Sequence, residues 1–228
     1  DYVILSGPVI KGAGTDGVIV KSGYNEVIVE KCDISGWGRL DTVSKNFENK
    51  AVWGEDNDAG IRVETGCKRI ILQRNKIHHP RWDSNSWREF NFNDILGRNG
   101  RTNEQIMDSI LQTAAFKRRG LRVHPFGPTA INLPRNRNGG NMVIRYNSIY
   151  SDDDHYYDDA VGNHGGSSNY LGFGPDSDVY GNYVSHARDN MITSEGAGMN
   201  IRIWGNYITE FYNPIALDPL SLGPTYIF

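Results

Sequence analysis

The chain has 228 residues and a formal charge of −3, from 24 Lys and Arg against 27 Asp and Glu. Its 12 Tyr, 8 Phe and 5 Trp are too many for a disordered chain, so we expect a folded protein with a sizeable core. Two cysteines are too few for a disulfide scaffold. No run of about 18 uncharged apolar residues is present, which excludes a membrane-spanning helix.

The near-neutral total conceals a sorting of charge along the chain. Residues 62–145 hold 16 basic and 6 acidic side chains, whereas residues 146–228 hold 2 and 11. This pattern predicts one segment that meets anions and another that gathers carboxylates. The alternative is that both sets are ordinary solvated surface.

A short motif recurs along the chain. Its pattern is apolar-x-apolar-x-x-Asn-x-apolar, where x is any residue. The alternation of apolar residues favours strands over helices. The Asn positions of successive copies, with Cys in the first copy, are separated by 43, 72, 35 and 24 residues. These positions are Cys32, Asn75, Asn147, Asn182 and Asn206.

A second motif precedes several copies of the first, and it spans residues 16–23, 59–66 and 189–196. Its alignment places Asp189 opposite Asp16, so a structural role in a turn is at least as good an interpretation of Asp189 as a catalytic one. Glu195 falls opposite Thr65, where the repeat asks only for a small polar residue. A glutamate at that place is a modest indication of function.

One such unit cannot bury its apolar face alone, so the copies must stack. Over residues 1–79 and 128–228, the periodicity with its repeated Asn resembles the right-handed parallel β-helix of the pectate-lyase-like superfamily, a group of carbohydrate-active proteins. The resemblance implies an all-β fold in which residues 1–228 form one right-handed parallel β-helix (solenoid) domain. Because both ends read as strands, we expect a fragment of a longer chain, or ends covered by other chain segments or copies.

Two insertions interrupt the repeat. The larger one, residues 80–127, is expected to be partly helical over residues 103–116, where apolar residues fall at helical spacing. Its many Arg and Lys residues would form a basic wall over a groove, with His124 entering the cleft as an acid or base. The second insertion, residues 150–175, is an acidic, Gly-rich loop.

The cysteines and one histidine pair receive structural interpretations. Cys32 occupies the Asn position of its copy, whereas Cys67 aligns with Tyr24 of the neighbouring coil. The two should therefore not stack, and we predict two free, largely buried thiols. The His78-His79-Pro80 sequence is interpreted as an ordinary turn, because it lacks the carboxylate or thiol spacing of a metal site.

Outward-facing residues of the repeat predict a binding surface. Stacked strands lie about 4.8 Å apart, so outward side chains of neighbouring copies come within reach of each other. Carboxylates, guanidinium groups and aromatic rings on a rigid sheet suit a sugar chain, because ring faces stack on pyranoses and charged groups bind hydroxyls. The alternative is an Asp178–Arg202 surface ion pair worth under about 1 kcal/mol. The surface comprises Arg145, Asp176, Asp178, Tyr180, Arg202 and Trp204.

The loop Asp152–Asp159 gathers five Asp, with His155 among them. Close carboxylates raise one another's pKa, so that one can act as a general acid while its partner stays ionised. Glycoside hydrolysis uses such a pair, about 5 Å apart for retention or about 6.5–9.5 Å apart for inversion. The same acids could bind Ca²⁺, which takes about six to eight oxygen ligands, or they could be a merely solvated loop.

These residues favour a polysaccharide-degrading enzyme, first of all a glycoside hydrolase, that needs no cofactor. Ca²⁺ could bind the Asp152–Asp159 loop, and no metal ligands are assigned elsewhere. The catalytic candidates are Asp158, Asp178, Asp189, Glu195 and His155. The candidates for substrate binding are Arg145, Asp176, Tyr180, Arg202, Trp204 and His124.

Two other functions remain open. A polysaccharide lyase would act on a uronate-containing glycan with a base such as His124 or His155, and a tailspike or adhesin would bind glycans without turnover. An anionic polysaccharide suits the basic insertion, whereas nucleic acid does not suit the acidic last third and a membrane is not expected. We expect a secreted or cell-surface protein, with the periplasm as a further location.

Overall fold

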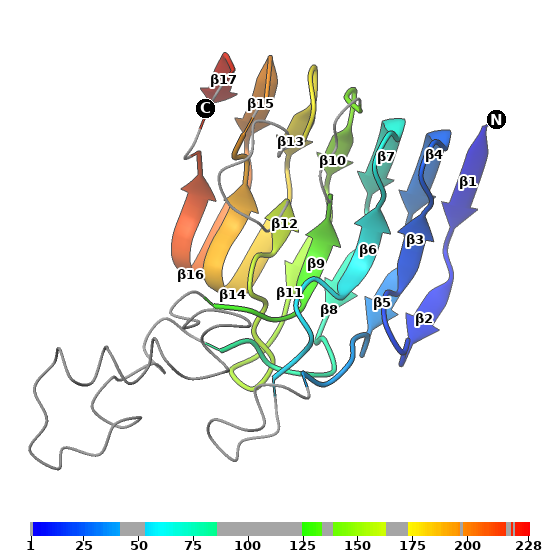
Figure 1. Ribbon diagram of the computed structural model, residues 1–228, viewed down its shortest axis with the longest axis vertical. Coiled ribbons are helices and arrows are strands. Elements are labelled where there is room, and N and C mark those ends of the chain that lie inside the picture. Colours follow the sequence, from blue (N-terminus) through cyan, green and yellow to red (C-terminus); the bar gives the residue numbers. More distant parts are fainter. Residues whose placement is uncertain are drawn as a thin grey trace, which may run out of the picture.

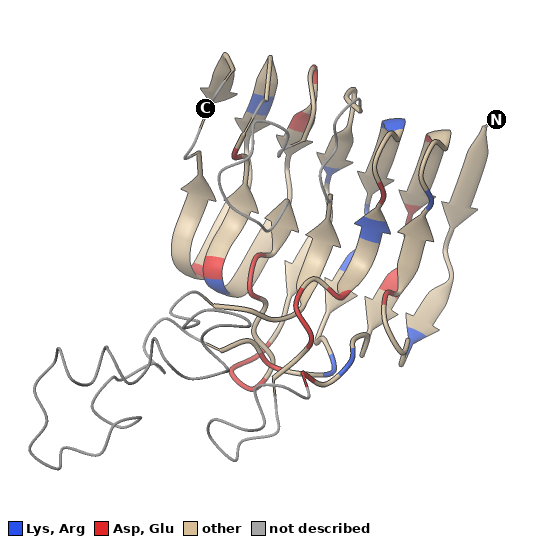
Figure 2. Cartoon of the chain, in the orientation of Figure 1, with Lys and Arg blue, Asp and Glu red and all other residues tan. Residues whose placement is uncertain are grey.

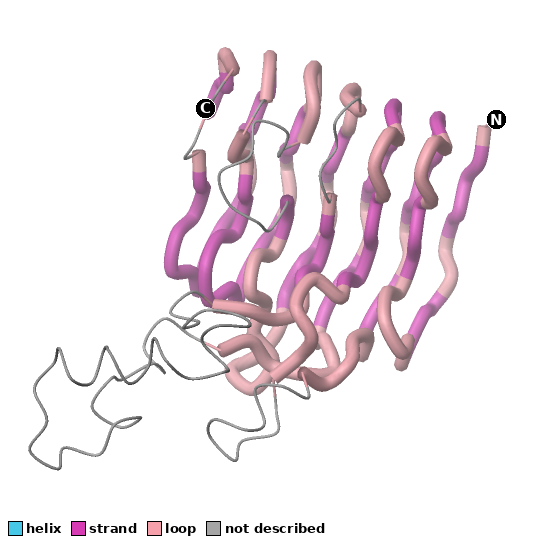
Figure 3. Tube along the Cα trace, viewed as in Figure 1, coloured by secondary structure: helices cyan, strands magenta, loops and turns pink. Residues whose placement is uncertain are grey.

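The computed structural model describes residues 2–41, 53–85, 125–133, 139–162, 173–196, 198–217, 220 and 222–228. Within these ranges the regular structure consists of strands without any helix, so the expected all-β class is confirmed (Figure 3). The predicted helix of residues 103–116 lies outside them. None of the described segments is a helix long and apolar enough to span a bilayer.

The strands form two sheets, in which every pair of described neighbours is parallel (Figure 1). The seven-stranded sheet has the order β1 (Val3–Ser6), β4 (Asn25–Glu30), β7 (Lys68–Gln73), β10 (Val143–Arg145), β13 (Asp178–Tyr180), β15 (Ile201–Trp204) and β17 (Thr225–Ile227). The ten-stranded sheet has the order β2 (Val9–Lys11), β5 (Asp33–Ser35), β8 (Lys76–His78), β11 (Ser148–Tyr150), β14 (Tyr183–Thr193), β12 (Val161–Gly162), β9 (Thr129–Asn132), β6 (Ala59–Val63) and β3 (Val18–Val20), with β16 (Tyr207–Ala216) beside β14.

The register of the seven-stranded sheet is the one that the first motif predicts. Val29 pairs with Leu72, Leu72 with Ile144, and Ile144 with Val179. Val179 pairs in turn with Ile203, and all of these side chains are buried in the core. Burying such a row of aliphatic side chains contributes roughly 1.5–3 kcal/mol per residue, which is why the copies stack.

A ladder of asparagine side chains runs through the turn between the two sheets. Oδ1 of Asn147 accepts the backbone N–H and the side-chain Nδ2–H of Asn75, both at 3.0 Å. Nδ2 of Asn147 donates to the Leu72 carbonyl and to Oδ1 of Asn182, both at 2.9 Å. Asn182 and Asn206 repeat the arrangement, and these hydrogen bonds join positions 43, 72, 35 and 24 residues apart, so the copies of the first motif stack as predicted.

The ladder ends at Cys32 for a reason visible in the preceding coil. The backbone N–H of Cys32 donates to Oδ1 of Asn75, as an Asn in this place would do. Asp33 pairs with Val9, so the residue beside Cys32 is Pro8, which has no N–H to continue the ladder. Both Cys32 and Cys67 are free and buried, as predicted, and burial raises the pKa of each thiol.

We expect Cys32→Asn to lower the free energy of unfolding by about 1–3 kcal/mol, although it restores the repeat, because its Oδ1 would be buried without a donor. A Pro8→Ala background supplies the missing N–H, and there the same substitution should cost less. Urea unfolding of the four proteins measures this coupling. An equal cost in both backgrounds would contradict the explanation.

The second motif aligns residues 16–23 with 59–66 as predicted, but the copy at 189–196 is offset by one residue from its predicted alignment, which is a correction. Ile192 pairs with Val161, Val161 with Ile131, and Ile131 with Ile61. The row of Asp16 therefore continues in Asp159 and Asn190, and Asp189 falls instead in the row of Asp158. β14 carries a register shift between Ala187 and Asn190, an irregularity that a sequence alignment does not reveal.

Candidate functional site

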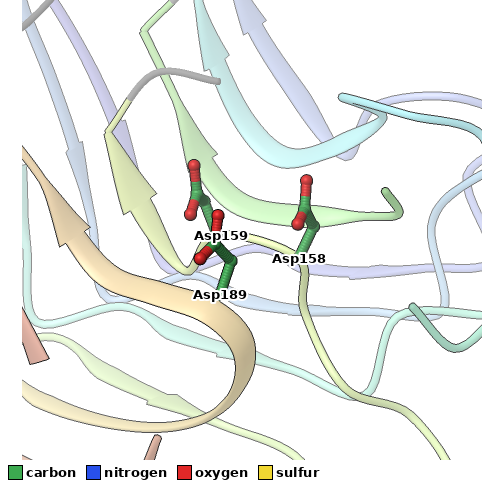
Figure 4. Close-up of side chains that lie close together, drawn as sticks. All are labelled: Asp158, Asp159 and Asp189. Carbon is green, nitrogen blue, oxygen red and sulfur yellow. The ribbon is translucent and has the colours of Figure 1, made fainter. Parts of the chain in front are cut away.

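Three buried aspartates lie together where the segment before β12 meets β14 (Figure 4). One carboxylate oxygen of each residue lies within 4.8 Å of an oxygen of the other two. The residues are Asp158, Asp159 and Asp189, and they are 0, 2 and 3 % exposed. We call them the carboxylate cluster. Asp158 and Asp189 were predicted as catalytic residues from separate segments, and the fold brings them together.

Parallel backbone pairing positions the cluster. The N–H of Asp158 donates to the Pro128 carbonyl at 2.9 Å, and the N–H of Asp189 donates to the Asp158 carbonyl at 3.1 Å. Oδ1 of Asp159 accepts the backbone N–H of Asn190 at 3.0 Å and its Nδ2–H at 3.1 Å. Asp16, one end of the same row, accepts the N–H of Ala59 in the same way at 2.8 Å. One oxygen of Asp159 therefore holds the next strand, which fixes the orientation of the carboxylate.

Further buried polar side chains flank the cluster. Thr129 on β9 lies beside Asp159, because Ile131 pairs with Val161 two residues later in each chain segment. Its Oγ1 is buried and has no hydrogen-bond partner among the described residues. Thr193 on β14 pairs with Gly162, and its Oγ1 is likewise without a partner in the described ranges. The Thr129 hydroxyl leaves the neighbourhood of the cluster able to accept a polar ligand, whereas Thr193 lies three residues farther along the strand than Asn190.

Three carboxylates this close can do two kinds of chemistry. They could hold a metal ion, because carboxylate oxygens are the ligands that Ca²⁺ prefers. They can also divide the tasks of acid and base, because glycoside hydrolysis uses one carboxyl group as an acid and another as a base or nucleophile.

Asp178 on β13 and Asp176 in the turn before it were also predicted as site residues, but both bind partners outside the carboxylate cluster. Nε and Nη2 of Arg202 each donate to one oxygen of Asp178 at 2.6 Å, a bidentate ion pair. This hydrogen bonding raises the pKa of Arg202. Oδ1 of Asp176 accepts from Nδ2 of Asn200 at 2.7 Å. Asp178 lies in the seven-stranded sheet, away from the strands of the carboxylate cluster, so the ion-pair interpretation describes it.

The aromatic residues of the predicted sugar surface stack on each other. Arg145 donates to the Tyr180 hydroxyl at 2.8 Å. The Tyr180 and Trp204 rings are 4.3 Å apart and 5° from parallel, and the Phe228 ring follows at 6.1 Å and 3°. Trp204 thus has a ring against each face. These residues lie together as predicted, but they offer ring edges rather than open faces to a sugar.

The remaining candidates lie apart from the cluster. His155 bonds Oδ1 of Asp152 at 2.8 Å in the loop after β11. Glu195 follows β14 and is half-buried. If the observed offset is carried forward, Glu195 corresponds to Glu64 rather than Thr65, so a glutamate is not unusual there. His124 and most of the basic insertion lie outside the described residues. In Figure 2 the acidic residues gather along the connections below the strands.

The sequence prediction missed Asp159 as a member of the cluster. A signal was present, because Asp159-Ala160-Val161-Gly162 is a short copy of the second motif inside the loop that was treated as an insertion. No protein-family model, curated protein or solved structure matches this chain.

Proposed function

We propose that this protein is a glycoside hydrolase that cleaves a polysaccharide with the carboxylate cluster. The observation that carries this proposal is the convergence of three buried carboxylates within 4.8 Å, from two segments about 30 residues apart. Hydrolysis of a glycosidic bond needs a carboxylic acid to protonate the leaving oxygen. It also needs a second carboxylate to attack the anomeric carbon or activate water.

The contacts within the cluster suggest a division of roles. Asp159 is oriented by the two N–H groups of Asn190, as a nucleophile or base requires. Asp158 and Asp189 then supply the acid. A separation of about 5–5.5 Å is typical of retaining enzymes, and inverting enzymes need about 6.5 Å or more, so we propose retention. The low exposure of the cluster means that a glycan reaches it only when chain segments around it move.

We further propose that the two sheets wind as a right-handed parallel β-helix. The support is that the chain returns to the seven-stranded sheet after each passage through the ten-stranded sheet, whose two halves meet at β14. A buried Asn ladder also joins neighbouring strands at one turn. The basic residues of positions 62–145 favour an anionic polysaccharide. Such polymers occur outside the cytoplasm, so we propose action in a secreted or cell-surface location.

A glycan-panel digest tests the proposed activity. The purified chain is incubated with neutral and uronate-containing polysaccharides, and products are read by mass spectrometry and ultraviolet absorbance. Hydrolysis predicts fragments that each gain one water. A 4,5-unsaturated uronide absorbance would establish a lyase instead, and binding without any cleavage would favour a tailspike or adhesin; either result overturns the proposal.

A further inference from the structure

Histidines and aspartates gather at one turn of the ten-stranded sheet, in a group that shares no residue with the carboxylate cluster. His78 ends β8 and His79 follows it, whereas Asp152 and His155 belong to the loop after β11. Nε2 of His78 lies 3.0 Å from Oδ1 of Asp33, and its Nδ1 lies 2.7 Å from Nδ1 of His79. Nε2 of His79 lies 3.4 Å from Oδ2 of Asp152.

The backbone holds His79 in a turn where the two preceding strands are followed by glycine and the next one by Ser151. His78 pairs with Ser35 and Ser35 with Lys11, so the next residues, His79, Gly36 and Gly12, form one row. Their φ angles are 47°, 67° and 74°, in the left-handed region. A non-glycine residue costs about 1–2 kcal/mol there. His186 and Glu210, farther along the same row, have left-handed φ angles too, so the conformation belongs to this turn of the fold and not to His79 alone.

The two atoms that face each other between His79 and Asp152 are both hydrogen-bond acceptors when His79 is neutral. The carboxylate of Asp33 only accepts, so His78 donates through Nε2 and presents a lone pair at Nδ1. His79 must then donate through its Nδ1. A neutral His79 therefore has a lone pair at Nε2, and this faces Oδ2 of Asp152, which is also an acceptor. A proton or a metal ion between the two makes this contact favourable.

A metal ion fits between Nε2 of His79 and Oδ2 of Asp152 by distance. At 3.4 Å the two atoms are farther apart than the roughly 2.7–2.9 Å of a charge-assisted hydrogen bond. Ligands that bind tetrahedral Zn²⁺ at about 2.0–2.1 Å are about 3.4 Å from each other, which is the distance observed here. The side chains of His79 and Asp152 are 40 and 49 % exposed, so an ion can reach them.

We propose that His79, Asp152 and His155 bind a divalent transition-metal ion of the Zn²⁺ class. His155 already contacts the other oxygen of Asp152 at 2.8 Å. Its ring centroid is 6.4 Å from that of His79, about 1 Å more than two imidazoles on one tetrahedral ion. The His155 side chain is 37 % exposed, and it must release its contact with Oδ1 of Asp152 to turn toward the ion. Three protein ligands leave a position for water.

Residues around His79 hold its side chain in the orientation that metal binding requires. A histidine ligand commonly donates its other N–H to a second group, and Nδ1 of His79 does so toward His78, which Asp33 orients. The Tyr150 ring stacks on His78 at 5.0 Å and 8°, and meets the edge of His79 at 5.7 Å. These contacts hold the first ligand in place before an ion arrives.

Calorimetric titration of the whole, chelator-treated chain with ZnCl₂ near neutral pH tests the proposal, with Co²⁺ absorbance as a report on tetrahedral geometry. We expect His79→Gly, which keeps the left-handed backbone, and Asp152→Asn each to weaken binding by about 100-fold or more, and Asp33→Asn by about 10–100-fold. His186→Ala is the control, a histidine on the same face that should leave the affinity unchanged.

Three results would overturn the proposal: no binding of Zn²⁺ below about 1 mM, unchanged affinity in folded His79→Gly, or binding that is lost only in Asp158→Asn and Asp189→Asn. The last result would place the ion in the carboxylate cluster. Circular dichroism of each variant confirms that it is folded. Because binding is measured without a glycan, a failure here is independent of the proposed hydrolase activity.

Discussion

Asn147→Ala should lower the free energy of unfolding by about 3–5 kcal/mol, the largest effect on stability that we expect from one side chain. The substitution leaves the Asn75 N–H without its acceptor and the Leu72 carbonyl without its side-chain donor, and Oδ1 of Asn182 keeps only the backbone N–H of residue 147. Each buried polar group left in this way costs about 1–3 kcal/mol. Since total stability is about 5–15 kcal/mol for a domain, the variant should be near the limit of folding. Urea unfolding followed by circular dichroism measures the loss.

Asn206→Ala is the matched control at the end of the same ladder. Asn206 makes the same contacts with Asn182 and the Val179 carbonyl, but it is only partly buried. Water can replace those hydrogen bonds, so we expect a loss of about 1 kcal/mol. Similar losses in both variants would show that the ladder is not a buried, mutually dependent network.

Asp158→Asn, Asp159→Asn and Asp189→Asn should each lower kcat on a cleaved glycan by about 10²–10⁴-fold, because a positioned acid or base contributes that much. The replacement keeps the size of the side chain and removes its charge and acidity. KM should change little, because the glycan is held by residues other than the cluster. Initial rates of reducing-end release give both constants.

Asp16→Asn is the matched control for this series. Asp16 lies in the row of Asp159 and makes the same hydrogen bond to the next strand, to Ala59, but it has Arg62 as its ion-pair partner instead of further carboxylates. We expect full turnover in Asp16→Asn and in Asp178→Asn. Loss of activity in these controls to the same degree as in the cluster would mean that stability, not chemistry, is being measured.

Much of the fold could be predicted because the residue type at each position of the repeat follows from its local place in a strand or turn. The alternation of apolar and polar residues predicted the buried row of Val29, Leu72, Ile144 and Val179. The spacing of the Asn residues predicted which turns stack on each other. The end of the ladder could not be predicted from Cys32 alone. It depends on Pro8, 24 positions earlier, and only the pairing of Asp33 with Val9 places these residues side by side.

The carboxylate cluster was half predictable. Asp158 stood out as one acid of a crowded loop, and Asp189 as an acid whose alignment with Asp16 equally allowed a structural role in a turn. The membership of Asp159 depends on the one-residue offset of β14. Alternation correctly grouped Tyr180 with Trp204, but it carries no information on ring orientation, so their mutual stacking was missed. The turn at His79 could not reveal its neighbours, because Asp152 and His155 come from a distant loop.

The central claim is that this protein hydrolyses a polysaccharide, and a digest in oxygen-18 water tests it most directly. Each cleavage by hydrolysis inserts one labelled oxygen, so mass spectrometry should find one label at every new reducing end, and none with Asp158→Asn. Unlabelled fragments carrying a 4,5-unsaturated uronide, or a glycan that binds and stays intact, would contradict the account.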